Sequence, residues 1–440
     1  MSIFRFFRKK TFPRGIHPEE HKDTAENGIR RIPFSPEIIL LLQRQIPCVK
    51  AGDSVYRGQK IADPDGGMSV PLHASVTGTV KAIADRIGQD GKMTPAIILE
   101  TSHLSSQNPY VGDWRNFEEM CKGEILSAIR ETGMVGLGGA GFPTHIKANP
   151  PEPNKIHTVI VNGCECEPFL TTDHRVMLES LPELFCGIRI IMKCTGAERA
   201  IIGLEDNTPD VLHAIREALP EDSPITVEAL LKKYPQGFEK TLIFALLGIE
   251  LPMGKLPASV GVGVFNVATL AAIGKLLPVH GGLIERVVTI GGPGISRPGN
   301  YLIPIGTPLK FVLEHCGFSG TARCVILGGP MMGKTVATLD IPVTKTTSGI
   351  LAFDKTLEEL KNDTPEYSCI RCGTCVQVCP MGLNPCELAR RAKAGRYEEM
   401  RDSFYLNNCC LCGSCAYHCP SGVPITNLIK TAQEMNRKKQ

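Results

Sequence analysis

Eight cysteines near the C-terminus constrain this chain more than any other feature of its sequence. They form two runs of identical spacing, Cys369-x2-Cys372-x2-Cys375-x3-Cys379-Pro380 and Cys409-x2-Cys412-x2-Cys415-x3-Cys419-Pro420. Three closely spaced thiolates on one loop can hold three corners of an iron–sulfur cubane, and a fourth thiolate from elsewhere closes the site. The spacing therefore predicts a module that holds two [4Fe–4S] clusters.

The two runs are similar to those of two-cluster bacterial ferredoxins, in which the fourth cysteine of each run ligates the other cluster. This similarity implies two crossed ligand sets, Cys369, Cys372, Cys375 and Cys419 for one cluster and Cys409, Cys412, Cys415 and Cys379 for the other. The alternative is a pair of zinc knuckles or disulfides, but zinc requires one closed tetrahedral set of four ligands. We therefore expect a protein that moves single electrons.

Length and composition place the chain among ordinary globular proteins. Its 440 residues correspond to about three or four domains. A net charge of +3 gives no reason to expect nucleic-acid binding. Of the 18 cysteines, ten lie outside the cluster runs, and so many free thiols beside cubane clusters indicate a reducing compartment.

The N-terminus mixes Phe4, Phe6 and Phe7 with cations and lacks the apolar core of a secretory signal. It could be a foot on a membrane surface, a solvated tail or a partner contact. The longest apolar stretch, residues 260–274, contains Asn266 and is too short to span a bilayer. We expect a soluble or peripheral protein.

The texture of the sequence changes several times along the chain. Short strands and Gly-containing turns in residues 49–61 and 76–80 resemble the lipoyl or biotinyl carrier fold, a flattened β-sandwich. The hairpin at residues 63–70, where such carriers present a modifiable lysine, has none, so we expect a structural module.

Strands are predicted next at residues 157–161, 200–204 and 225–230, with helices at 173–193, bent or broken by Pro182, and at 209–218. This alternation predicts an α/β layer with a mostly parallel sheet. Residues 285–353 indicate a small β-rich domain and residues 355–366 a charged linker. Helical spacing between and after the cysteine runs predicts a helical cluster module.

A glycine-rich loop carries the second chemical signal, Gly136-Leu-Gly-Gly-Ala-Gly-Phe-Pro-Thr-His-Ile-Lys147. Four glycines in six residues allow the backbone to approach a ligand closely and to turn its N–H groups toward an anion. The loop is not the usual dinucleotide fingerprint, because a polar helix-like segment precedes it instead of a strand. An ordinary flexible loop is the alternative.

The strand at 157–161 ends in Asn162-Gly-Cys-Glu165-Cys-Glu167-Pro168. Ligands of open α/β sheets bind at the carboxyl ends of the strands. Asn162 could bond the edge of a heterocycle, and Glu165 and Glu167 could accept from ribose hydroxyls or a nicotinamide amide. A solvated acidic turn is the alternative for either glutamate alone.

With these motifs the chain resembles the flavin- and NADH-binding subunit of respiratory complex I and, in its module order, the C subunit of the Rnf electron-transport complex. Rnf C subunits also open with a segment similar to residues 14–22 of this chain, Arg-Gly-Ile-His-Pro-Glu-Glu-His-Lys. The resemblance implies a multidomain α/β protein with four parts. These are a tail and barrel-sandwich module (1–115), a Rossmann-like FMN/NADH domain (116–280), a ligand-binding β-grasp (SLBB) domain (281–355) and an α-helical dicluster ferredoxin domain (356–440).

The resemblance also implies roles for single residues. The backbone at Gly136, Gly138 and Gly139 would face FMN, Lys147 would reach its phosphate or ring edge, and Phe142 would stack near the nicotinamide. Asn162 would contact the flavin and Glu167 the adenosine side of NADH, with Glu165 in the same cofactor-binding group. Tyr234, Gly237 and Asn266 would complete the flavin pocket, with Glu239 near the nucleotide.

The chain departs from the relatives at three positions. Leu137 stands where complex I has arginine, as it does in Rnf-type proteins, and Cys164 stands where complex I has aspartate. Phe238 replaces a glycine that is general in Rnf-type proteins and could narrow the flavin pocket.

The resemblance implies an ion-translocating ferredoxin:NAD oxidoreductase subunit, peripheral on the cytoplasmic face of the inner membrane. It would pass electrons between NAD(H), FMN and two [4Fe–4S] clusters. Its partners would be the other subunits, including a ferredoxin-like iron–sulfur subunit, and indirectly ferredoxin or flavodoxin, with no nucleic acid. The alternatives are a non-catalytic iron–sulfur adaptor and a soluble Rnf-like reductase. Spacing does not decide which cluster faces the flavin.

Overall fold

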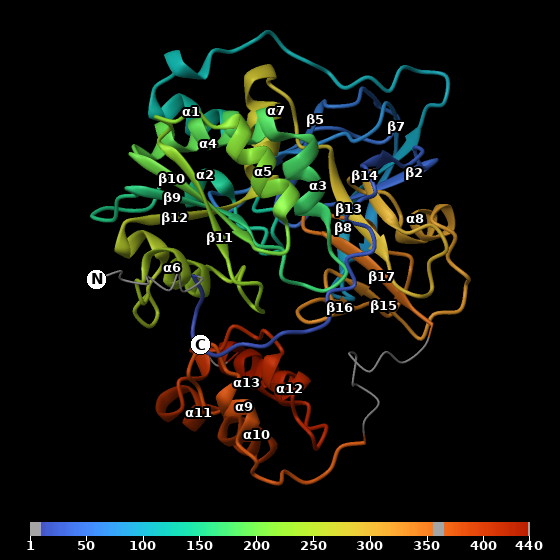
Figure 1. Cartoon of the computed structure of the whole chain (residues 1–440). Coiled ribbons are helices and arrows are strands. Elements are labelled where there is room, and N and C mark those ends of the chain that lie inside the picture. Colours follow the sequence, from blue (N-terminus) through green and yellow to red (C-terminus); the bar gives the residue numbers. More distant parts are fainter. Residues whose placement is uncertain (1–9, 355–364, 439–440) are drawn as a thin grey trace.

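The computed structural model describes residues 10–354 and 365–438 (Figure 1). Phe4, Phe6 and Phe7, the apolar residues of the predicted membrane foot, and most of the predicted charged linker lie outside these residues. Four structural units follow one another along the chain. Within the described residues no helix is both long and apolar enough to cross a membrane.

The first unit consists of two small antiparallel sheets, with strand orders β2-β8-β7-β4 and β3-β5-β6. Their strands are β2 (Glu37–Leu41), β3 (Gln45–Pro47), β4 (Ser54–Val55), β5 (Lys60–Pro64), β6 (Leu72–His73), β7 (Gly78–Ile87) and β8 (Met93–Thr101). Ile38, Leu40, Ile61 and Leu99 are fully buried between them. This is the β-sandwich that the alternating sequence predicts, with its hairpin free of lysine.

The second unit is a four-stranded parallel sheet of order β11-β10-β9-β12. Its strands are β9 (Thr158–Gly163), β10 (Arg199–Glu205), β11 (Ile225–Leu230) and β12 (Val262–Asn266). Its helices are α1 (Lys122–Glu131), α2 (Thr144–Lys147), α3 (Thr172–Glu179), α4 (Leu181–Thr195), α5 (Pro209–Ala218), α6 (Glu239–Leu247) and α7 (Val267–Leu276). The predicted break near Pro182 is confirmed, because α3 ends at Glu179 and α4 begins at Leu181.

Helices cover both faces of this sheet, as a parallel sheet requires. Val159 and Val161 of β9 pack with α4 and α7, whereas Ile160 packs with α6 on the opposite face. Figure 1 shows α6 on one side of the sheet and α4, α5 and α7 on the other.

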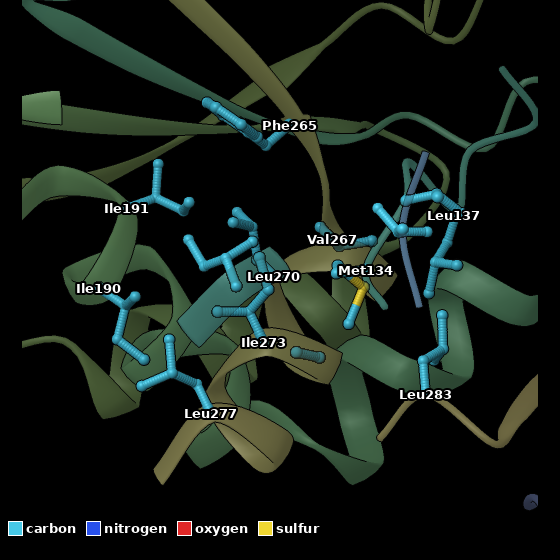
Figure 2. Packing of buried hydrophobic residues seen from close by; sticks show 14 of the residues in the cluster. Met134, Leu137, Ile190, Ile191, Phe265, Val267, Leu270, Ile273, Leu277 and Leu283 are labelled. Atoms are coloured by element: carbon cyan, nitrogen blue, oxygen red, sulfur yellow. The ribbon is translucent and has the colours of Figure 1, made fainter. Parts of the chain in front are cut away.

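Helices α4 and α7 make an unusually close contact within this core. A Cβ added to Gly187 of α4 would lie 1.9 Å from the Leu270 carbonyl oxygen of α7. Around the crossing, Ile190 and Ile191 pack opposite Leu270 and Ile273 (Figure 2). Because α7 follows directly from β12, this contact fixes the helix whose first residue lies at the carboxyl edge of the sheet.

The third unit is a six-stranded sheet of order β1-β14-β13-β17-β15-β16. Its strands are β1 (Arg30–Arg31), β13 (Glu285–Gly291), β14 (Gly299–Pro304), β15 (Cys324–Leu327), β16 (Lys334–Thr335) and β17 (Gly349–Phe353), with α8 (Leu309–His315) packed against them. The edge strand β1 comes from the N-terminal segment, which therefore leaves the first unit to complete this one.

The fourth unit is helical, as predicted. It contains α9 (Thr374–Gln377), α10 (Pro385–Lys393), α11 (Tyr397–Ser403), α12 (Ser414–Tyr417) and α13 (Ile425–Lys438). Leu388, Met400, Leu406 and Ile429 are buried in its own core. In Figure 1 this unit (red) lies below the other three, next to the N-terminal segment drawn in blue.

Candidate functional site

The two cysteine runs adopt the same backbone conformation. Arg371 and Leu411, each directly before the second cysteine of its run, have φ values of 57° and 56°, and Gly373 and Gly413 have 78° and 82°. A left-handed conformation is uncommon for arginine or leucine, so its occurrence at both equivalent positions marks a repeated loop. A short helix, α9 or α12, then carries the third cysteine of each run.

The four cysteines of one predicted set line a single pocket of the fourth unit. Its lining includes Cys409, Cys412 and Cys415 of the second run and Cys379 of the first. Burial raises the pKa of Cys409 to about 12, and the charges of Cys412 and Cys379 add to the effect. A thiol of this kind ionises when metal binds and releases its proton. The fold thus places the crossed cysteine among the three local ones.

The other predicted set is also assembled by the fold. Burial raises the pKa of Cys375, and the nearby thiols of Cys372, Cys419 and Cys369 add to the effect. In the described residues no three His, Cys, Asp or Glu side chains converge closely enough to hold a single metal ion. A cubane needs its thiolates distributed around it, whereas zinc needs four ligands on one ion.

Two further cysteines lie beside these sets. The Cys386 Sγ is 3.7 Å from the Cys369 Sγ, and Cys410 lies in the pocket lining next to Cys412. Neither fits the spacing of the runs, and the sequence predicts packing roles for both.

The glycine-rich loop lies at the carboxyl edge of the parallel sheet and is closed by its own backbone. The Gly136 N–H donates to the Phe142 carbonyl at 2.9 Å, and the Gly141 N–H donates to the Gly136 carbonyl at 3.2 Å. Gly139 has φ of 107° with open space beside it. The backbone at Gly139 is therefore accessible to a ligand, and a residue with a side chain would be strained there.

Three contacts tie this loop to α7, to the third unit and to the end of β12. The Leu137 N–H donates to the Thr269 hydroxyl of α7 at 2.9 Å. The guanidinium of Arg286, on β13, donates to the Leu137 carbonyl at 3.3 Å. Gly138 packs against the side chain of Asn266, which a Cβ at Gly138 would approach to 3.2 Å. The loop is thus a fixed element of the second unit.

Asn162, the last residue but one of β9, pairs with Asn266, the last residue of the neighbouring strand β12. From β9 the chain continues to β10 on one side, while β12 flanks β9 on the other, so Asn162 and Asn266 lie where the strand order reverses. The Asn162 amide donates to the Gly237 carbonyl at 2.8 Å. The Asn266 amide oxygen accepts from the Thr269 N–H at 3.2 Å and caps α7.

Lys147 ends the loop segment, and its ammonium forms an ion pair with Glu239 at the start of α6. The same ammonium lies 5.7 Å from the centre of the Phe265 ring. Phe142 is 40% exposed on the outer side of the loop. The structure therefore gathers the glycine loop, Lys147, Asn162, Asn266, Gly237 and Glu239 at one edge.

The other three predicted pocket residues have different surroundings. The Glu165 carboxylate accepts from the Thr172 hydroxyl at 2.7 Å and from the Asp173 and His174 N–H groups, at the start of α3. The Glu167 carboxylate accepts from the Met331 and Met332 N–H groups, both at 2.9 Å. Burial raises the pKa of Glu167 to about 7.

Tyr234 lies deeper still. Its side chain is 1% exposed, and its hydroxyl donates to the Cys412 carbonyl in the fourth unit at 2.6 Å. In this conformation Glu165 serves as a helix cap, whereas Glu167 and Tyr234 lie at a junction between units. Their predicted roles toward NADH and flavin remain predictions.

Several residues near this edge were not identified from the sequence. The Asp173 carboxylate accepts from the Asn266 amide at 2.6 Å, and burial, followed by the charge of Glu165, raises its pKa to about 7. The Lys22 ammonium donates to the carbonyls of Glu165, Glu167 and Leu170 and holds the loop after β9. Only the half-buried position of Asp173 and its bond to Asn266 distinguish it from other acidic residues, and sequence reports neither.

The donor set at this edge suits an anionic heterocyclic cofactor. It offers accessible backbone at Gly139, a cation at Lys147 and amides at two strand ends. The Thr144 hydroxyl, after the loop, and the side-chain amide of Gln236, next to Gly237, are buried without a hydrogen-bond partner among the described residues. Buried polar atoms without partners are uncommon and indicate that the site can bind a further polar group.

Family models match the four units in order. They are the RnfC barrel sandwich hybrid domain over residues 10–103, the Nuo51 FMN-binding domain over 129–275, the SLBB domain over 287–335 and a 4Fe-4S dicluster domain over 368–424. The predicted order of modules is confirmed. The fold and the site define a class of protein that joins a flavin domain to an iron–sulfur module in one chain.

The full-length matches are more specific. The chain is 40% identical to the C subunit of the Na(+)-translocating ferredoxin:NAD(+) oxidoreductase complex of Acetobacterium woodii, over 88% of this chain and 89% of that protein. It is 40% identical to the C subunit of the proton-translocating complex of Clostridium ljungdahlii, over 90% and 88%. The chain belongs to the RnfC family, the C subunits of ion-translocating ferredoxin:NAD(+) oxidoreductase complexes.

Two further matches are less complete or less similar. The C subunit of the ion-translocating oxidoreductase complex of Edwardsiella ictaluri is 37% identical over 91% of this chain, which spans only 51% of that protein. A chain of an NAD+-reducing [NiFe]-hydrogenase superposes with a TM-score of 0.53 at 21% identity, over 74% of this chain and 64% of that one. At that identity the hydrogenase match supports the fold alone.

Proposed function

We propose that this chain is the electron-transfer C subunit of an Rnf-type ferredoxin:NAD oxidoreductase complex and passes electrons between NAD(H), FMN and two [4Fe–4S] clusters. One observation carries the proposal: in a single chain of the RnfC family, each predicted cysteine set is brought together and a glycine-rich loop lies at the switch point of a parallel sheet. A flavin supplies the step between the two-electron chemistry of a nicotinamide and the one-electron chemistry of a cubane.

The residues of this chain would bind the flavin and orient it. The backbone of residues 136–141 and the Lys147 ammonium would hold the anionic part of FMN, and Asn162 and Asn266 would lie at its ring edge. The Lys147 ammonium forms an ion pair with Glu239, so binding of an anion there would exchange one partner of the lysine for another. Hydride transfer needs no side-chain acid or base, and none is assigned.

The eight run cysteines would hold the clusters in the crossed sets given above. Further subunits of an Rnf-type complex are the partners. We propose that the partner that takes electrons is a ferredoxin-like iron–sulfur subunit, and that the chain lies peripherally on the cytoplasmic face of the membrane.

The experiment is anaerobic reconstitution of the full chain, with acid-released flavin and iron measured separately. We expect about eight irons and one flavin per chain, and bleaching of both chromophores by NADH. Iron without flavin, and no response to NADH, would refute the NADH-linked part and leave an iron–sulfur adaptor.

Phe238 is the residue that favours the alternative function, a non-catalytic iron–sulfur adaptor. It is the N-cap of α6, with φ of −72°, so its backbone does not need the glycine that relatives carry there. A Phe238→Gly variant separates the two functions. If Phe238 narrows the pocket, the variant gains flavin; if the unmodified chain already binds one flavin, the adaptor is excluded. A soluble reductase is distinguished by its absence from washed membranes that retain the complex.

A further inference from the structure

The fourth unit meets the flavin-type unit through one of its two cysteine sets. Besides donating to the Cys412 carbonyl, Tyr234 packs in a buried cluster with Ile16 and Cys412, against which Cys410, Tyr417 and Val378 also lie. Cys412 is itself buried. The contact is therefore made by the loop that carries the second run.

The third unit joins the same junction through residues 329–333. Glu167, on the loop after β9, accepts from two N–H groups of this segment, and its carboxylate oxygen lies 3.5 Å from the Tyr234 hydroxyl. A Cβ on Gly413, directly after Cys412, would lie 3.0 Å from the Met331 carbonyl oxygen. The second and third units therefore both pack against the Cys412 loop of the fourth.

The N-terminal segment adds a second link to the same cysteine set. Ile16 and Tyr234 exchange two backbone hydrogen bonds of 2.9 Å each. The adjacent Gly15 donates its N–H to the carbonyl of Val378, the residue before Cys379. Gly15 has φ of 81°, and a Cβ there would lie 2.7 Å from the Tyr234 carbonyl oxygen. Cys379 belongs with Cys412 in the crossed assignment, so both links reach one set.

The other set faces outward. Cys369 and Cys372 are exposed, and between them Ile370 is 68% exposed. Tyr367, two residues before the run, is 61% exposed. The equivalent positions of the second run are intermediate at Cys409 and buried at Cys412. The repeat is thus symmetric in backbone but not in surroundings.

We propose that the set Cys409, Cys412, Cys415 and Cys379 holds the inner cluster, which exchanges electrons with the flavin side. The set Cys369, Cys372, Cys375 and Cys419 then holds the outer cluster, which exchanges electrons with the partner. Tyr234 is a positioning residue that fixes the inner set against the flavin-type unit. This inference rests on the proposed function and adds the order of the two sites.

The proposed order of the two clusters accounts for every electron and requires no chemical change in the protein. One electron at a time passes from the flavin side to the inner set, then to the outer set, and leaves to an oxidised iron–sulfur partner. Two such passages account for the two electrons of one hydride. No bond in the protein forms or breaks.

The test compares Cys412→Ala with Cys372→Ala, each reconstituted in the full chain. Flavin content and NADH bleaching of the flavin report the proposed function separately. Dithionite should give the electron paramagnetic resonance signal of the remaining cluster in both variants. With NADH, Cys372→Ala should give that signal as the unmodified chain does, whereas Cys412→Ala should give it at least tenfold more slowly. The reverse pattern, or equal rates, would overturn the order.

A second measurement does not require any variant to fold. Brief oxidation of the reconstituted chain, followed by thiol alkylation and mass spectrometry, should label Cys369 and Cys372 before Cys409 and Cys412. Labelling of the second run first would contradict the order.

The role of Tyr234 is tested by Tyr234→Phe, with the exposed Tyr405→Phe as the matched control. Tyr234→Phe should slow NADH reduction of the inner cluster about threefold to tenfold, the effect of one lost hydrogen bond, and shift the potential of that cluster alone. An unchanged potential and rate would exclude a positioning role.

Discussion

The Asn266 amide donates to the half-buried Asp173 carboxylate at 2.6 Å, while its oxygen caps α7. Burial, followed by the charge of Glu165, raises the pKa of Asp173 to about 7, and the Asn266 hydrogen bond is the largest influence that opposes this rise. One side chain at the end of β12 therefore stabilises both a helix terminus and a carboxylate under the glycine loop.

Asn266→Ala should destabilise the chain by about 1–3 kcal/mol, because it removes the cap and leaves a half-buried carboxylate without its donor. A carboxyl whose pKa is raised on folding loses stability as pH rises through that pKa. The deficit should therefore be larger at pH 8 than at pH 6. Thermal midpoints at both values check this, with the exposed Asn108→Ala as control. Equal deficits at the two pH values would contradict the coupling to Asp173.

Lys147→Met should lower flavin binding without unfolding the chain. The Lys147 ammonium is half-buried between Glu239 and the Phe265 ring, and it is the cation that the loop offers to a phosphate. The loss of a charged hydrogen bond should weaken FMN binding about tenfold or more. Fluorescence titration of the flavin-free chain measures the affinity. The control Lys155→Met should bind FMN normally, and a normal affinity in Lys147→Met would remove this lysine from the site.

A comparison of Cys379→Ala with Cys386→Ala distinguishes a cluster ligand from a cysteine that only lies beside a cluster. If ligation is crossed, Cys379→Ala should remove the cluster of the second run, so that iron falls from about eight to about four per chain. Cys386→Ala should keep about eight, although its sulfur is 3.7 Å from that of Cys369. Iron analysis after anaerobic reconstitution decides between them. Four irons in Cys386→Ala would make that thiol a ligand.

Gly187→Ala tests the close contact of α4 and α7. The new methyl group would overlap the Leu270 carbonyl oxygen, which belongs to the backbone and cannot rotate away. We expect a loss of about 1–3 kcal/mol or more, despite the better helix propensity of alanine. Gly123→Ala in α1, where the nearest atom would be 3.9 Å away, is the helical control and should be neutral or stabilising. Thermal melting measures both, and equal stability would contradict the close contact.

What can be predicted from the sequence depends on short-range pattern. Cysteine spacing is a local signal, so the two runs and their similarity to ferredoxins are enough to propose both crossed sets. The strand and the loop that carry Asn162 and Gly139 are likewise set by neighbouring residues. The surroundings of Glu167 and Tyr234 depend on Met331 and Cys412, which lie more than 160 residues further along the chain. Hydrophobic periodicity in a sequence does not reveal contacts between residues so far apart along the chain.

The difference between the surroundings of the two cysteine runs could not be predicted from the sequence, for the same reason. The runs have one spacing and one backbone conformation, and the packing of other units against the set of Cys379 and Cys412 distinguishes them. Asp173 and Arg286 were missed because an acidic or basic residue in a helix or strand is usually solvated. Their burial follows from the docking of the third unit on the second.

His73 provides a pH test of how the units pack. Its ring is 7% exposed, and burial, followed by the charges of Lys345 and Lys60, lowers its pKa to about 3. Between pH 6.5 and 3 the unfolded chain therefore binds a proton that the folded chain does not. Its contribution is fully present above pH 6.5 and is lost as pH falls, by an amount on the order of 4 kcal/mol.

His73→Gln removes this proton uptake, and its Nδ1 has no hydrogen-bond partner among the described residues to lose. The fall in thermal midpoint between pH 6.5 and 4.5 should therefore be smaller in His73→Gln than in the unmodified chain. The exposed His103→Gln should keep the original slope. Because half-buried carboxyls such as Asp173 titrate with the opposite sign, only the difference between variant and unmodified chain isolates His73. Parallel curves for all three proteins would mean that His73 is protonated in the folded chain.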